Sequence, residues 1–191
     1  MFTVFAIVLH VSLSFDSSIR SRIVKAGAAA EAEAIWRDYD VDLSWADRPD
    51  VHMCLAAYVG RSAAPPLPSM RAVLGTTLVG PDPTVAPAPI RIGFDTVDAL
   101  ASPAASVNAM MHEYAVGNAI GRVLAHEIGH ILLGAPSYHD PTGLMRSNFL
   151  TDDFSRSDRW RFKLAGNSAA RLRERIVALS QLAIAPGCPA H

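Results

Sequence analysis

The chain has 191 residues, of which 50% are hydrophobic, so it can form a globular domain with a proper core and is not a disordered chain. Its 17 basic and 18 acidic residues give a net charge of −1, and we therefore expect no nucleic-acid partner. Two cysteines are too few for a disulfide framework. Cys54 and Cys188 either form one bridge, or Cys54 is buried and Cys188 is a free thiol in the tail.

The first element is an apolar run from Phe2 to Phe15, for which two interpretations compete. Its length is near that of a signal-peptide core, but it lacks a basic start, so we see no clear signal peptide. It is also too short to span a bilayer as a helix. Residues from Val8 to Ser14 partly alternate and are rich in β-formers, and for that reason we prefer a strand.

Most of the next eighty residues are predicted to build a sheet with one covering helix. Asp16, Ser17 and Ser18 are expected to cap an alanine-rich amphipathic helix over residues 19–39. A strand, a helix and a second strand in this order imply a parallel pair with a right-handed crossover. Apolar alternation and turn residues predict further strands over residues 41–45, 51–59, 73–79 and 90–94. The sequence therefore predicts an α/β fold with a mostly parallel twisted sheet of about five strands.

The second half of the chain is predicted to be helical. A long helix begins near Ser106 or Asn108 and runs to Leu133, where Gly134 suits the left-handed turn that closes a helix. Ser157 is expected to cap a helix over residues 158–165, and another helix follows over residues 166–182. Small residues recur every four positions in the long helix and predict close packing against a neighbouring element. They are Gly117, Gly121, Ala125 and Gly129.

The segment with the clearest chemistry lies inside the long helix. His126 and His130 are four residues apart, so they project from the same face about one turn apart and can bind one ion. Glu127 lies beside that ion, where it can take a proton from a bound water molecule. Catalytic zinc usually has three protein ligands, and His139, which follows the turn at Gly134, is our choice for the third.

Alternatives to His139 exist downstream of the helix. A carboxylate completes the zinc site in some protein classes, and the acidic residues available here are Asp152, Asp153, Asp158 and Glu174. Tyr138 could help to stabilise an oxyanion, although exposed tyrosines beside turns are common. His112 begins a second His-Glu pair, but it lies about 21 Å along the helix from His126 and is not expected to join the site.

Residues 125–146 resemble the metzincin clan of zinc metallopeptidases, and short bacterial metzincin-like proteins in particular. The clan has an HExxH helix, a glycine turn, a third histidine and a tight turn that carries a methionine under the metal. Carried over by position, the resemblance makes His126, His130 and His139 the zinc ligands, Glu127 the general base and Met145 the turn methionine. The spacing departs from the usual HExxHxxGxxH, because the glycine comes one residue later and the third histidine three residues later.

The resemblance implies a zincin-like catalytic domain over residues 1–185. The Pro- and Gly-containing residues 186–191 are expected to form a disordered tail. The resemblance also implies an antiparallel edge strand from Leu74 to Val79, along which an extended peptide or protein substrate would bind. A zinc metallopeptidase follows, with a secreted or periplasmic location favoured and no membrane span. Three alternatives stay open: a non-catalytic protein with a structural or stored zinc ion, a metzincin-like fold that has lost catalysis, and a zinc amidase or esterase acting on a non-peptide substrate.

Overall fold

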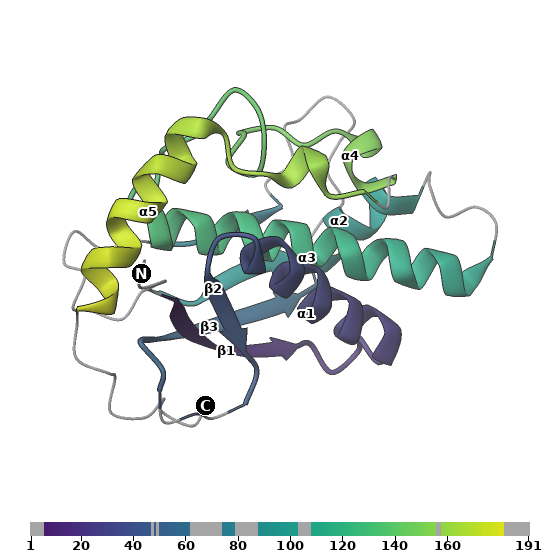
Figure 1. The fold of residues 1–191 in the computed structure, drawn as a ribbon. Coiled ribbons are helices and arrows are strands. Elements are labelled where there is room, and N and C mark those ends of the chain that lie inside the picture. The colour runs from purple at the N-terminus through teal and green to yellow at the C-terminus, as the bar shows by residue number, and fades with distance from the viewer. Residues whose placement is uncertain are drawn as a thin grey trace.

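The structure is a computed structural model that describes residues 6–46, 48, 50–61, 74–78, 88–102, 108–155 and 158–181. Over these residues the chain has an α/β fold with a five-stranded, mostly parallel sheet and an antiparallel edge strand, as predicted. In chain order the elements (Figure 1) are β1 (Ile7–Phe15), α1 (Arg22–Arg37), β2 (Val41–Ser44), β3 (Met53–Gly60), β4 (Gly75–Thr76), β5 (Ile90–Gly93), α2 (Phe94–Ala101), α3 (Ala109–Leu133), α4 (Thr151–Ser155), a 3-10 turn (Trp160–Phe162) and α5 (Gly166–Ser180).

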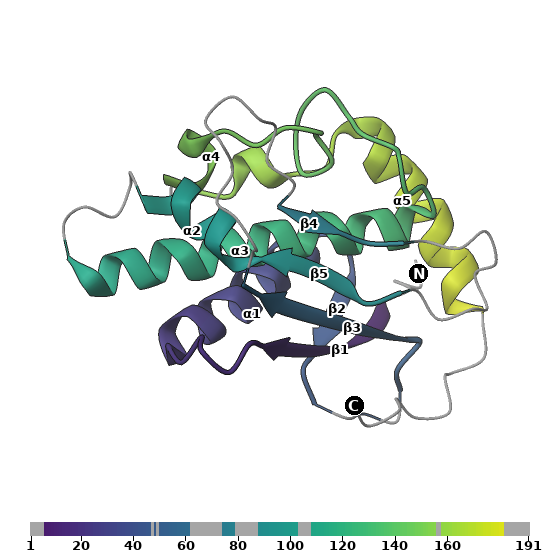
Figure 2. The same ribbon diagram turned by 180° about the vertical axis from the view of Figure 1, so that it is seen from behind.

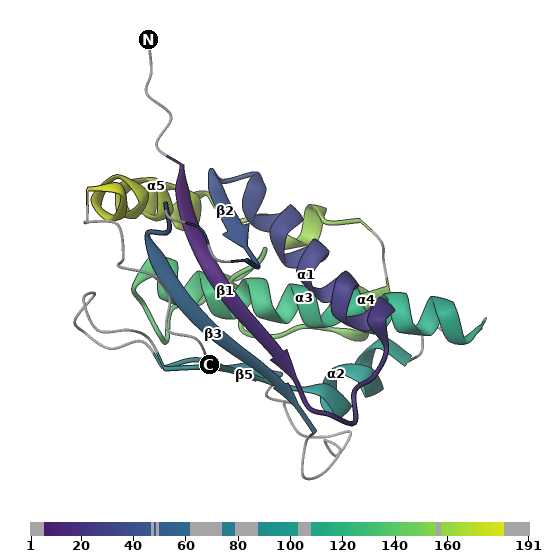
Figure 3. The same ribbon diagram turned by 90° about the horizontal axis from the view of Figure 1, so that it is seen from below.

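The predicted first strand is confirmed, and it is an internal strand of the sheet. The strand order is β2-β1-β3-β5-β4, and β1 runs parallel to both of its neighbours (Figure 3). The unit β1-α1-β2 forms the parallel pair that the sequence predicts. Because β1 is hydrogen-bonded on both sides, removing it as a cleaved signal peptide would divide the sheet.

Helices α1 and α3 cover one face of the sheet, which lies in front of them in Figure 2. The two helices pack closely where their glycines meet. A Cβ atom on Gly27 would lie 3.4 Å from the Cα atom of Gly117, and a Cβ atom on Gly121 would lie 2.6 Å from the carbonyl oxygen of Ala28. The small-residue stripe of α3 therefore brings two backbones together, as predicted.

Both ends of α3 agree with the sequence. The side chain of Asn108 accepts a hydrogen bond of 2.8 Å from the backbone N–H of Met111, which caps the helix. Gly134 has a φ of 59° and closes the helix with a left-handed turn. None of the helices in the described part of the chain has both the length and the apolar composition needed to cross a membrane. Ser106, which was the other residue proposed as the start of α3, lies outside the described residues.

Other predicted boundaries are wrong. The first is the start of α1, and local hydrogen bonds explain it. Helix α1 begins at Arg22 and is capped by Ser21, whose side chain accepts a hydrogen bond of 3.2 Å from Val24. The residues expected to cap it form a separate turn instead, because the Asp16 carboxylate accepts from both the backbone and the hydroxyl of Ser18.

The helix predicted over residues 158–165 is replaced by the short 3-10 turn, because the chain that follows it is held in an extended conformation by distant groups. The carbonyl of Lys163 accepts a hydrogen bond of 2.9 Å from Leu144, and the backbone N–H of Leu164 donates one of 2.7 Å to the Tyr39 hydroxyl. Helices α2 and α4 were not predicted. The predicted fourth strand is reduced to the two residues of β4, and its proposed ends at 73 and 79 lie outside the described residues.

Two predictions about the tail also fall outside the described residues. The tail itself, residues 186–191, is one of them, and so is the state of Cys188. Cys54 in β3 is not a free thiol. Helix α5 confirms the last predicted helix as far as Ser180.

Candidate metal centre

The centre of the site is the pair of histidines in the C-terminal half of α3. His126 and His130 are only 6% and 5% exposed, and their rings meet edge to face with centroids 4.7 Å apart. The Nε2 atoms of the two rings lie 3.0 Å from each other. The four-residue spacing in the sequence therefore produces the convergence that it predicts.

Backbone carbonyls fix the orientation of both rings. Nδ1 of His126 lies 2.7 Å from the carbonyl oxygen of Leu144, and Nδ1 of His130 lies 3.1 Å from that of Ala135. A carbonyl oxygen can only accept, so Nδ1 is the protonated nitrogen in each ring and Nε2 carries the lone pair. This is the arrangement that metal-binding histidines usually have, with one nitrogen held by the protein and the other free for the ion.

The electrostatics of the pair also favour a cation. Burial lowers the pKa of His126 to about 4 and lowers that of His130 as well, so both rings are neutral near pH 7. Two neutral acceptor atoms 3.0 Å apart repel each other unless a cation lies beside them. The donor set therefore fits a metal ion.

His139 completes the group from the loop that follows Gly134. Its ring centroid lies 5.5 Å from that of His126 and 5.0 Å from that of His130. One ligand atom from each of the three residues lies within 4.8 Å of the others, and His139 is exposed while the helical pair is buried. The three predicted histidines thus form a group that could hold a metal ion.

Glu127 follows His126 on α3 and faces the edge strand β4. It is 5% exposed, and burial raises the pKa of its carboxyl to about 7. A Cβ atom at Gly75 in β4 would lie 2.8 Å from its Oε1 atom, so the edge strand runs directly over this carboxylate. No other charged side chain of the described residues forms an ion pair with Glu127.

The Gly143-Leu144-Met145 turn contacts the site through Leu144 and Met145. Gly143 has a φ of 80°, which glycine tolerates best, and Leu144 supplies the carbonyl that binds His126. Met145 is fully buried, and its sulfur occupies the space that a side chain at Gly129 would need. The turn and α3 therefore fit together through a residue that has no side chain.

The neighbours of His139 bind to the last helix. The Asp140 carboxylate is buried and accepts hydrogen bonds from the Tyr138 hydroxyl, at 2.9 Å, and from the Ser168 hydroxyl on α5. The backbone of Asp140 also donates a hydrogen bond of 2.8 Å to the carbonyl of Met145. The loop that carries His139 is thus tied to α5 and to the methionine turn. Because the Tyr138 hydroxyl points to Asp140, this geometry gives no support to an oxyanion role.

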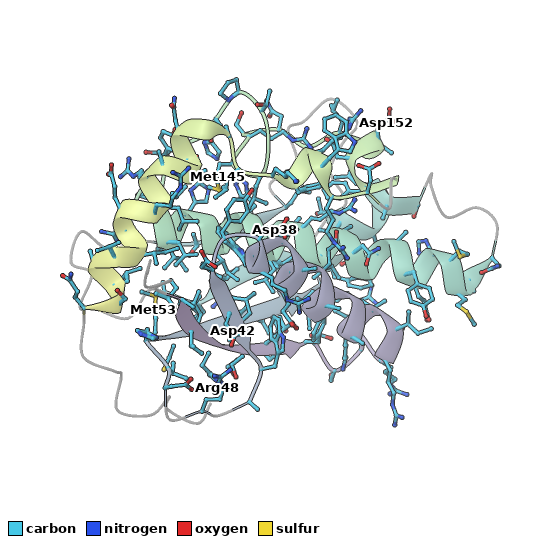
Figure 4. All side chains as sticks on the ribbon, viewed as in Figure 1. Asp38, Asp42, Arg48, Met53, Met145 and Asp152 are labelled. Carbon is cyan, nitrogen blue, oxygen red and sulfur yellow. The ribbon has the colours of Figure 1, made fainter. Side chains whose placement is uncertain are left out.

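The carboxylates considered as alternative ligands do not join the histidine group in the described residues. Asp153 is buried and pairs with Arg146 at 2.7 Å and Arg161 at 3.1 Å. Asp152 lies on α4, well separated from Met145 in Figure 4. Asp158 lies between α4 and the 3-10 turn, and Glu174 lies on α5. His112 pairs with Asp98 at 2.8 Å and is not part of the histidine group, as predicted.

Sequence reasoning missed a buried charge network next to the site. Arg122, fully buried on α3, binds Glu31 of α1 at 2.8 Å and donates to the carbonyl of Asp153 at 2.6 Å. The guanidinium of Arg146 lies over the Phe149 ring, whose own edge-to-face contact with His126 has a centroid distance of 5.3 Å. The sequence offered one indication of this network. Arg122 lies in the apolar part of a long helix, where a charged side chain needs a buried partner.

No family model and no curated protein matches this chain. The resemblance to metzincins therefore rests on the motif in residues 125–146.

Proposed function

We propose that the protein is a zinc metallopeptidase of the metzincin-like type, with His126, His130 and His139 as zinc ligands. The observation that carries the proposal is the pair of Nε2 lone pairs that face each other 3.0 Å apart, with a third imidazole beside them. Imidazole nitrogens suit zinc well, and three protein ligands with an open fourth position are typical of catalytic rather than structural zinc.

Glu127 is the residue that moves the proton. A zinc ion at this site would polarise a peptide carbonyl and lower the pKa of a water molecule. The Glu127 carboxylate accepts the proton of that water and passes it to the leaving amine. Its burial favours this role, because a carboxylate in a poorly solvated place has a raised affinity for the proton.

The edge strand β4 supplies a place for an extended peptide. The backbone N–H of Gly93 donates to the carbonyl of Leu74 at 3.0 Å, and Gly75 stands opposite Ile92. In an antiparallel ladder the paired groups alternate, so the N–H and C=O groups of Gly75 point away from β5 toward the open edge. A peptide that adds a strand there would bring its backbone close to Glu127.

The test is hydrolysis of a mixed peptide library by the zinc-loaded protein and by two matched variants of α3. Glu127→Gln should keep its zinc and lose at least about a hundredfold in turnover, since general acid–base catalysis contributes that much or more. Glu113→Gln, on the same helix but outside the site, should cleave like the parent. Undiminished turnover in Glu127→Gln would exclude the mechanism.

The same library distinguishes the alternatives. A zinc-loaded parent that cleaves amide or ester model compounds but no peptide would be an amidase or esterase. Bound zinc without any hydrolysis would favour a structural or stored ion, or a fold that has lost catalysis.

A further inference from the structure

A small pocket opens on the outer face of the sheet, the face opposite to α1 and α3. It has a volume of about 240 Å³ and lies over β3, β5 and β4, where the edge strand passes Glu127 on its inner face. Two glycines, Gly60 and Gly93, stand opposite each other and leave its floor without side chains. Its walls are formed by Tyr58, Arg61, Leu74 and Arg91.

Arg91 is the charged residue of this pocket that can bind a ligand. Its side chain is exposed, and within the described residues it forms no ion pair. Arg61 differs, because it binds Asp95 at 2.5 Å and lies over the ring of Phe94. The Tyr58 hydroxyl donates to Asp16 at 3.2 Å, so that group too is already engaged. Among the described residues that line the pocket, Arg91 is therefore the guanidinium without an ion pair, and it can bind a ligand.

The strand register places Arg91 in line with the proposed substrate. Arg91 stands opposite Tyr58 on one side and opposite Thr76 of β4 on the other, so all three side chains are on the outer face. A peptide strand added to β4 would place one residue beside Thr76 in the same row. Its backbone would lie two strand spacings from that of Arg91, about 9.6 Å.

Side chains of the right length cross this distance. Thr76 is small and leaves the row open between the peptide and Arg91. An extended arginine reaches about 6 Å and a glutamate about 3 to 4 Å beyond their backbones, so the guanidinium and a carboxylate can meet over Thr76 in the bidentate geometry that they prefer. An aspartate is shorter and would meet Arg91 less well.

We propose that the β4 side of this pocket, at Thr76 and Arg91, is a substrate subsite that selects an acidic side chain, glutamate above all, and that Arg91 is its specificity-determining residue. The inference rests on the proposed peptidase function and on strand addition to β4. It concerns the substrate residue beside Thr76, whose side chain lies on the opposite face of the sheet from Glu127.

Binding without cleavage tests the subsite separately from catalysis. Fluorescent octapeptides of alanine and threonine carry a single glutamate at each position in turn, and two matched sets carry glutamine or lysine there. Their dissociation constants are measured by fluorescence anisotropy with zinc-loaded Glu127→Gln protein at low and at physiological salt. The same protein carrying Arg91→Gln, Arg91→Glu or the control Arg173→Gln, an exposed arginine of α5, is measured alongside.

We expect one position where glutamate binds about fivefold more tightly than glutamine, as for a partly exposed ion pair, with the advantage reduced by salt. Arg91→Gln should remove this advantage and Arg173→Gln should keep it. Arg91→Glu should prefer a lysine at the same position.

The subsite is excluded if no position prefers glutamate, if the preference survives Arg91→Gln, or if none of the peptides binds. Failure of the proposed function has a different signature, because the parent protein would then cleave no peptide whatever its charge. If the parent cleaves the library but the binding of the glutamate peptides does not depend on Arg91, the proposed peptidase function is retained and only the subsite is rejected.

Discussion

At the scale of single residues, the site depends on two helical histidines and on the backbone carbonyls that hold their rings. The four-residue spacing is a local property of a helix, so it places His126 and His130 together whatever surrounds them. The carbonyls of Leu144 and Ala135 that hold the rings depend on how the chain turns after Gly134. His139 was chosen from its place beyond that turn, and its exposure could not be inferred.

Gly129 gives the sharpest prediction at this scale. In Gly129→Ala the new methyl group must displace the Met145 sulfur, and a crowded core of this kind costs about 1–3 kcal/mol of unfolding free energy. Metal affinity should fall as well, because Met145 is next to the residue whose carbonyl orients His126. Urea unfolding and a chelator competition measure the two effects.

Gly166→Ala is the matched control, because a Cβ atom there would meet nothing within 4 Å. That variant should keep the metal affinity and the stability of the parent. Equal unfolding free energies and equal metal affinities in the two variants would show that the Met145 sulfur does not pack tightly against Gly129.

At the scale of elements, the loop that carries the third histidine depends on α5. Ser168→Ala removes the hydroxyl that binds the buried Asp140 carboxylate, so His139 should be held less firmly. Loss of such an outer partner typically weakens metal binding by about tenfold or more. Ser180→Ala on the same helix removes only a hydroxyl bonded to its own helix, and should bind metal like the parent. Equal zinc dissociation constants for the two variants would contradict the role given to α5.

The buried ion pair between α1 and α3 predicts a large effect on stability. Arg122→Met leaves the Glu31 carboxylate in the core with only the half-exposed Arg159 as a partner. Breaking a buried pair in this way costs about 3–5 kcal/mol, which urea unfolding would detect. Arg37→Met removes an exposed pair with Glu33 on the same α1 helix and should cost less than about 0.5 kcal/mol. A similar small loss in both variants would mean that Arg122 contributes little.

At the scale of the whole molecule, the sheet and the two long helices were predictable because their patterns extend over many residues. The shorter elements were not. The chain from Lys163 to Leu164 is extended because of Leu144 and Tyr39, which are far away in the sequence. Likewise Arg122 and Glu31 are 91 residues apart, and no periodicity in the sequence indicates which carboxylate an arginine will meet. Local rules therefore predicted the framework and the histidine pair, and tertiary contacts decided the rest.

The most direct test of the three-histidine site is the number of zinc ions per chain, measured by elemental analysis of zinc-loaded, dialysed protein. We predict one zinc ion in the parent, a clear loss in His139→Ala, and one ion again in the control His112→Ala, whose ring pairs with Asp98 outside the site. One zinc ion in both the parent and His139→Ala would contradict His139 as the third ligand, and none in the parent would contradict the metal centre itself.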